Sequence, residues 1–191
     1  MTSLRERKKQ ATRVALQAAA LRLALAKGLD EVRVDEIAEA AGVSPRTYNN
    51  YFPSREHAIV AAVTASRVPT VDAGGPLAGA VTDAVVRYYT EPGDRDAMLM
   101  ITTNPALRAC YVEATAGIEA PVAEAIVGRG ADARTAEVLA AAVGAAAKVA
   151  LRRWLQPTGT AGLMVVSGSL PDLMLAALAP LTPALEAAER G

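Results

Sequence analysis

The stretch SPRTYNNYFPSRE, residues 44–56, decides the fold of the first third of this chain. Ser44 followed by Pro45 is a typical helix start, because serine can accept a hydrogen bond from a free backbone N–H and proline in the first turn needs no partner. Tyr48 and Phe52 are four residues apart and would share the buried face of this helix. Two adjacent asparagines, which are mediocre helix formers, then fall on the outer face. Their presence indicates a face chosen for contact with something other than the protein core.

Two helices are predicted before this one. Residues 4–27 carry an apolar stripe with helical spacing, formed by Val14, Ala18, Leu21 and Leu25, and a glycine follows as a stop. Residues 34–41 make a shorter helix with two acids in its first turn, where the helix dipole favours negative charge. A glycine turn then leads to Ser44. A helix, a short helix, a glycine turn and a second short helix make up a helix-turn-helix, whose second short helix enters the DNA major groove.

The outer face of the second short helix carries side chains that suit DNA. Arginine reads guanine and asparagine reads adenine through paired hydrogen bonds, so Arg46 and Asn49 are predicted to contact base edges. The alternative is a solvated helix face. Asn50 is equally well explained by contact with phosphate or water. A basic cluster that opens the first helix would grip phosphates, and it consists of Arg5, Arg7, Lys8 and Lys9.

Composition and charge agree with an all-α chain that meets an anionic partner. Among the 191 residues the net charge is zero, but residues 1–67 hold 11 Lys and Arg against 7 Asp and Glu, a net of +4. The remaining residues hold 9 against 13, a net of −4. A basic first third indicates local contact with nucleic acid. No run alternates with the period of a strand, and the high alanine content favours helices.

No constellation in the sequence indicates catalysis or metal binding. Cys110 and His57 are the only cysteine and the only histidine, so they form neither a disulfide nor a metal-ligand cluster. Cys110 is predicted to be a buried inert thiol, with a redox sensor as the alternative, and His57 a structural or exposed imidazole. No nucleophile, Walker or dinucleotide motif occurs, so no enzyme activity and no cofactor are predicted. No apolar run is as long as a membrane span or a signal peptide requires, and a cytoplasmic location is expected.

The remainder of the chain is predicted to be helical after a short linker. Residues 68–76, VPTVDAGGP, are rich in proline and glycine and indicate a linker or a domain boundary. Breaks rich in glycine, proline and asparagine separate the helical patterns that follow, and a short terminal piece would follow Pro183. The helices are predicted at about 77–91, 94–103, 105–128, 132–155 and 161–178.

The run VDEIAEAAGVSPRTYNNYFPSREHAI, residues 34–59, resembles the DNA-binding domain of the TetR family of bacterial repressors. The matching pattern extends from Arg13 to Val60. The later portion NPALRACYVE…LRRWL has a weaker similarity to a branch that includes the mycofactocin-system regulator, which points toward acyl thioesters. The resemblance implies an N-terminal three-helix helix-turn-helix domain plus a C-terminal helical ligand-binding and dimerisation domain. The expected division is 1–53 for DNA binding, 54–67 as a connecting helix and 68–191 for ligand binding and dimerisation.

The resemblance adds further DNA-contacting residues. Thr47 and Tyr51 match the family's phosphate contacts, although simple packing would also explain them, and Arg55 would be a phosphate contact or a surface charge. Where the family usually has a capping Thr or Ser before the first short helix, this chain has Arg33, for which a direct charge contact is predicted. The predicted DNA-binding set is Arg5, Arg7, Lys8, Lys9, Arg33, Ser44, Arg46, Thr47, Asn49, Asn50, Tyr51 and Arg55.

The resemblance also implies partners. They are a double-stranded palindromic operator, a second copy paired through the helices at 132–155 and 161–178, and a small-molecule inducer of unknown identity; no membrane is expected. Lys148, Arg152 and Arg153 would meet an anionic group of the ligand, or else serve the dimer or the surface. A helical adaptor and a DNA-binding regulator without a ligand are the alternatives. The predicted pocket residues, which favour a largely apolar ligand, are Tyr88, Tyr89, Met98, Met100, Tyr111 and Trp154.

Overall fold

The structure is a computed structural model, and the part of the chain that it describes is entirely α-helical apart from turns and short 3₁₀ helices. No strand occurs among these residues, which confirms the predicted all-α class. No helix among them is long and apolar enough to cross a membrane. The structure describes residues 3–65, 67, 69–91, 93–155 and 168–190.

The chain divides into two compact units, and the chain passes between them more than once. The first unit comprises residues 1–66 and 93–111, and the second comprises residues 67–92 and 112–191. The helices within residues 93–111 therefore belong to the same compact unit as the N-terminal helices. The assignment of DNA binding, connection and ligand binding to 1–53, 54–67 and 68–191 stays a prediction.

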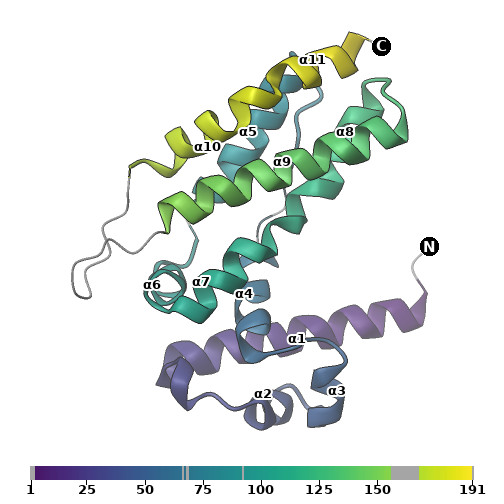
Figure 1. The fold of residues 1–191 in the computed structure, drawn as a ribbon. Helices are drawn as coiled ribbons and strands as arrows, with labels where there is room; N and C mark the ends of the chain where they lie inside the picture. The colour runs from purple at the N-terminus through teal and green to yellow at the C-terminus, as the bar shows by residue number, and fades with distance from the viewer. Residues whose placement is uncertain (1–2, 66, 68, 92, 156–167, 191) are drawn as a thin grey trace. The chain divides into compact units, whose positions relative to one another are not determined.

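The first unit is built around the long N-terminal helix (Figure 1). A 3₁₀ turn, Leu29–Glu31, follows that helix. The N-terminal helix packs against the fourth and second helices, and the third helix packs against the second. A compact core results, in which Leu16, Ile37 and Ile59 are completely buried. The helices are α1 Leu4–Lys27, α2 Val34–Ala40, α3 Pro45–Asn49, α4 Arg55–Ala65, α6 Arg95–Thr103 and α7 Pro105–Glu113, the last of which ends in the second unit.

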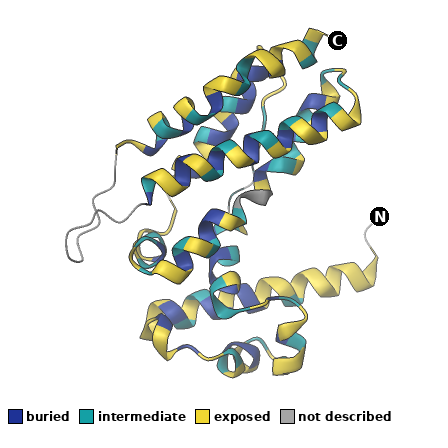
Figure 2. Cartoon of the chain, viewed as in Figure 1, coloured by how far each residue is buried: buried dark blue, intermediate teal, exposed yellow. Residues whose placement is uncertain are grey.

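The buried face of α1 differs from the apolar stripe that the sequence predicted. Val14 and Leu25 are 50% and 41% exposed, whereas Leu16, Ala20 and Ala24 are buried. The helix is so rich in alanine and leucine that more than one face is apolar, and periodicity alone cannot choose between them. The small alanines form the face that packs, because they allow a close approach of neighbouring helices. The first three turns of α1 are almost wholly exposed (Figure 2).

The second unit is a bundle in which α9 lies between α8 and α10, while α10 and α11 also pack on α5 (Figure 1). Its centre contains Val81, Ile126, Val143 and Met174, all with no exposed surface. Short 3₁₀ helices precede α8 and join α10 to α11. The helices are α5 Leu77–Thr90, α8 Glu119–Gly128, α9 Ala133–Trp154, α10 Leu170–Leu178 and α11 Thr182–Arg190.

Two predicted helices are corrected by the structure. The single helix expected over 105–128 is broken by the 3₁₀ segment Ala114–Ile118. Gly117 lies in this segment, and a Cβ at its position would lie only 3.0 Å from the hydroxyl oxygen of Tyr88. The helix expected over 161–178 begins instead at Leu170, and residues 161–167 lie outside the described residues. The short terminal piece is α11.

Candidate nucleic-acid interface

The helix α3 is held at its first turn by a hydroxyl cap. The Ser44 Oγ accepts a hydrogen bond from the backbone N–H of Thr47 at 3.1 Å, and the Oγ atoms of the two residues lie 2.9 Å apart. Pro45 occupies the first helical position. This start is the one that the sequence predicted. The helix ends sooner than expected, at Asn49, with Asn50 as its C-terminal cap, so the two asparagines lie at the end of the helix and not at its centre.

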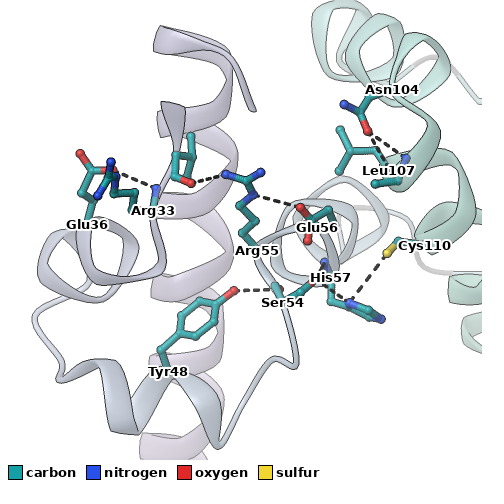
Figure 3. Close-up of polar contacts among 12 residues, drawn as sticks. Arg33, Glu36, Tyr48, Ser54, Arg55, Glu56, His57, Asn104, Leu107 and Cys110 are labelled. Carbon is teal, nitrogen blue, oxygen red and sulfur yellow. Dashed lines mark hydrogen bonds and ion pairs between the residues drawn. The ribbon is translucent and has the colours of Figure 1, made fainter. Parts of the chain in front are cut away.

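Two aromatic side chains anchor α3 from behind. Tyr48 is completely buried and Phe52 almost so, with ring centroids 5.9 Å apart. The Tyr48 hydroxyl donates a hydrogen bond to the carbonyl oxygen of Ser54 at 2.8 Å (Figure 3). Burial raises the pKa of Tyr48 to about 12, so the hydroxyl stays protonated and can act as this donor. The Arg13 guanidinium lies 5.0 Å from the centroid of the Phe52 ring and closes the cluster on the α1 side.

The outer edge of α3 leaves three polar side chains exposed. Arg46, Asn49 and Asn50 are all exposed, and within the described residues none of their side chains makes a hydrogen bond or ion pair. A polar edge without internal partners keeps its hydrogen-bonding capacity for an external one. Its placement on a capped and anchored helix gives that edge a fixed direction. Contact of these side chains with base edges stays a prediction.

Gly42 makes the turn between α2 and α3. Its φ is +70°, and a Cβ built there would meet nothing within 4 Å, so the requirement for glycine is conformational and not steric crowding. Because an L-residue in this region is strained, Gly42→Ala is expected to lower the free energy of unfolding by about 1–2 kcal/mol. Thermal and urea denaturation would measure the change. Gly74→Ala is the matched control, since its Cβ also meets nothing within 4 Å and its φ is not left-handed; an equal loss in both variants would contradict the argument.

An acid in the first turn of α2 accepts the backbone N–H of the residue that precedes the helix. The Glu36 carboxylate accepts a hydrogen bond from the Arg33 backbone N–H at 2.9 Å, and both of its oxygens lie 2.7 Å from Lys27 Nζ. The hydrogen bond from Lys27 and that from Arg33 hold the pKa of Glu36 below its ordinary value. The Arg33 side chain does not cap the helix and is exposed. It is therefore available for the predicted charge contact.

Arg55 is engaged inside its own unit. Its Nη1 donates to the carbonyl oxygen of Val32 at 2.6 Å, and its Nε donates to Glu56 Oε1 at 2.9 Å (Figure 3). The guanidinium thereby joins the start of α4 to the segment that enters α2. Nothing in the sequence signalled this contact, which spans 23 positions. Any phosphate contact by Arg55 would have to use the donors that these bonds leave over.

A basic hollow lies between the first turns of α1 and the segment after α3. Tyr51 lines it from one side, and Glu6 in α1 forms a loose ion pair of 3.8 Å with Lys9 there. Two of the lining residues, Gln10 and Arg13, were not predicted from the sequence. They follow Arg7 at steps of about one helical turn, and this spacing would have placed them on the same face of the helix. The basic cluster itself, Arg5, Arg7, Lys8 and Lys9, is helical and exposed. The residues that line the hollow are Glu6, Arg7, Lys9, Gln10, Arg13 and Tyr51.

The single histidine, in α4, and the single cysteine, in α7, lie next to each other. His57 Nδ1 is 2.9 Å from Ser54 Oγ and 3.8 Å from Cys110 Sγ (Figure 3). Burial, followed by the nearby charge of Glu56, raises the pKa of the Cys110 thiol. A raised pKa lowers the thiolate fraction and therefore the reactivity of the sulfur. Among the described residues, no group of histidine, cysteine, aspartate and glutamate could hold a metal ion.

The predicted pocket residues are spread over the two units. Met98 and Met100 in α6 and Tyr111 in α7 belong to the first unit. Tyr88 and Tyr89 in α5 belong to the second, where their rings meet edge to face with centroids 4.8 Å apart, and Trp154 ends α9 there. The tyrosines are buried and the other three half-buried. A role in ligand binding stays a prediction for all six.

Two of the three basic residues near the end of α9 are paired with an acid within the second unit. Lys148 Nζ and Arg152 Nη2 lie 3.0 Å and 3.1 Å from the two carboxylate oxygens of Glu113. These two hydrogen bonds, Lys148 first, hold the pKa of Glu113 below its ordinary value. Lys148 and Arg152 thus already have an anionic partner, whereas Arg153 is exposed.

Comparison with known proteins agrees with this geometry. The model of bacterial regulatory proteins of the tetR family matches residues 16–63, and the MftR C-terminal domain matches residues 75–186, more than half of the chain. TcmR, an HTH-type transcriptional regulator of Streptomyces glaucescens, is 42% identical over 62 residues, or 32% of this chain and 27% of that protein. The alignment thus spans about a quarter of that relative's length.

Solved structures show the same fold. The Thermus thermophilus FadR, a TetR family repressor in complex with lauroyl-CoA, has a TM-score of 0.52 at 19% identity, covering 88% of this chain and 92% of that one. RolR in complex with resorcinol has a TM-score of 0.50 at 20% identity, covering 97% and 96%.

A capped, anchored helix with a free polar edge, next to a basic first helix, defines a helix-turn-helix DNA-binding unit. The chain belongs to the TetR family of transcriptional regulators. Members of this family are DNA-binding regulators and not enzymes. The fold is accordingly an N-terminal helix-turn-helix domain plus a helical C-terminal domain.

Proposed function

We propose that this regulator is a homodimeric repressor that binds a palindromic operator through α3 and leaves it when a small, largely apolar ligand binds. The observation that carries the proposal is the free polar edge of α3, formed by Arg46, Asn49 and Asn50. Arginine and asparagine are the side chains that pair bidentately with guanine and adenine in the major groove. Because bacterial DNA lies in the cytoplasm, a repressor of this kind would act there.

Exposed apolar residues on α9 and α10 support the proposal of a homodimer. Val138 and Val149 on α9 are 62% and 46% exposed, and Leu175 on α10 is 47% exposed. Exposed Ala141 and Ala145 continue the row on α9, at the spacing of one helix face. Apolar rows of this kind on adjacent helices suit pairing with a second copy. Two copies would place two α3 helices about one DNA turn apart, roughly 34–36 Å.

Two kinds of observation support the binding of a small, largely apolar ligand. Two structures with the same fold contain small molecules, an acyl thioester in one and a phenol in the other. The largely aliphatic interior of the second unit suits a mainly apolar compound. A ligand displaces the regulator from DNA only if it prefers the conformation that binds DNA less well. A regulator that takes no ligand would instead keep its operator affinity whatever compound is added.

The experiment that tests DNA binding is fluorescence anisotropy with the DNA upstream of the protein's own gene, measured over a range of salt concentrations. A specific repressor should bind this duplex at least 10³-fold more tightly than a scrambled duplex at physiological salt. Its logarithmic affinity should fall linearly with the logarithm of salt. Equal affinity for the two duplexes, or none for either, would leave a helical adaptor as the better proposal.

Removal of the N-terminal basic cluster separates phosphate contact from sequence reading. Replacement of Arg5, Arg7, Lys8 and Lys9 with glutamine is expected to weaken binding to all duplexes similarly. The slope of logarithmic affinity against logarithmic salt should decrease by about 0.9 for each side chain that contacts a phosphate. The ratio between operator and scrambled DNA should change little. A loss of equal size at every salt concentration would contradict the proposed phosphate contacts.

A further inference from the structure

The segment between α4 and α5 reads in the sequence as a plain linker, but an arginine from the α8–α9 turn binds its backbone. Arg129 Nη1 donates to the carbonyl oxygen of Gly75 at 2.9 Å. Its Nη2 donates to the carbonyl oxygens of Asp72 and Ala73 at 3.1 Å and 3.0 Å. The Arg129 side chain is only 16% exposed. A guanidinium that binds three carbonyls within four residues fixes the path of the chain, because its donors have a rigid planar geometry.

The same arginine is joined to the C-terminal helix. Glu189 in α11 lies 2.6 Å from Arg129 Nη1 and accepts the backbone N–H of Leu77 at 3.1 Å. Pro76 precedes α5 and offers no side-chain cap, so the carboxylate from α11 supplies that cap. The hydrogen bond from Leu77 and then that from Arg129 hold the pKa of Glu189 below its ordinary value. The carboxylate is therefore charged at neutral pH, as the ion pair requires.

Two other arginines hold the earlier part of the segment. Arg87 in α5 donates through Nη2 to the carbonyl oxygen of Thr70 at 3.0 Å and pairs with the Asp72 carboxylate at 3.3 Å. Arg67 donates to the carbonyl oxygen of Tyr88 at 3.3 Å. The described residues from Arg67 to Leu77 are thus bound to other parts of the second unit at the start, the middle and the end.

We propose that Arg129 and Glu189 form a C-terminal clasp, by which the last helix locks the segment that follows α4 and thereby sets how firmly α4 is held. The regulatory role of the clasp rests on the proposed function, to which it adds that the ligand releases the operator through a shift of α4. With the clasp closed, residues 69–77 form a fixed strap, and a shift of α4 has to work against this strap. With the clasp open, the strap gains conformational freedom that DNA binding must remove again.

Hydrogen exchange tests the clasp directly. In Glu189→Ala, the amide of Leu77 loses its acceptor, and exchange of the 69–77 peptides should become at least tenfold faster, while the helix-turn-helix peptides 34–52 keep their rate. Arg129→Gln should give the same pattern. Glu186→Ala is the matched control, because it lies one turn earlier in the same helix and forms only an exposed 3.9 Å pair with Arg190. Wild-type exchange of 69–77 in both clasp variants would overturn the clasp.

Operator binding tests its consequence. The clasp variants should bind the upstream duplex roughly 5–20-fold more weakly than the wild type, and Glu189→Gln, which keeps an acceptor for Leu77, should recover part of the loss. Faster exchange with unchanged operator affinity would overturn the regulatory role and leave a purely structural contact. If the wild type itself fails to bind DNA specifically, the proposed function fails, whereas the exchange result still decides whether the clasp exists.

Discussion

Tyr48→Ala is expected to lower the free energy of unfolding of the first unit by about 3–5 kcal/mol. The ring is completely buried between α3 and the rest of the core, next to Phe52. Its removal deletes apolar area and leaves a cavity, and the surroundings can close that cavity only in part. The variant should also lose operator binding, because α3 has only five helical residues and depends on packing for its stability. Urea denaturation and near-ultraviolet circular dichroism would measure the loss.

Tyr48→Phe separates packing from hydrogen bonding. The phenyl ring keeps the volume, and only the 2.8 Å hydrogen bond to the Ser54 carbonyl is lost. A loss of about 0.5–1.5 kcal/mol is expected, the usual net value of one hydrogen bond. If alanine and phenylalanine were equally destabilising, the hydroxyl and not the ring would anchor α3. If neither had an effect, the helix would be held by its cap alone.

The sequence predicted α3 well because its signals are local. A serine–proline start and an aromatic pair four residues apart act within one or two turns, and the structure places all of them as expected. Gly42 is of the same kind, since its positive φ is a property of one residue. The helix-turn-helix could therefore be recognised from residues that lie next to one another in the chain.

Other features could not be predicted because they depend on distant partners. The buried face of α1 is chosen by the helices that pack on it, and the alanine-rich sequence offers several apolar faces. The contact from Arg55 to the Val32 carbonyl and that from Arg129 to the strap join segments 23 and more than 50 positions apart. Any arginine on a helix could make such contacts, and composition does not say which one does. For this reason the sequence indicates only a linker or a domain boundary at residues 68–76, since proline and glycine report local irregularity and not the presence of a clasp.

Arg46→Ala and Asn49→Ala are each expected to weaken operator binding by about 1–3 kcal/mol and to relax the preference for one base pair. Both side chains are exposed and form no hydrogen bond or ion pair within the described residues, so their removal costs the folded protein little. Thermal stability and dimer mass should remain those of the wild type. Anisotropy with a set of operators, each changed at one base pair, would measure affinity and preference together.

The pattern of losses across the operator set distinguishes base reading from nonspecific contact. A side chain that reads a base loses most on the native sequence and least where that base pair is already changed, because the mismatch has removed the same hydrogen bonds. For Asn49 the affected position should be an A·T pair and for Arg46 a G·C pair. Asn50→Ala is the control from the same edge and should lower the affinity for all sequences slightly and equally. If Asn49→Ala behaved like Asn50→Ala, the helix would touch only the DNA backbone there, and specificity would have to come from DNA shape or from other residues.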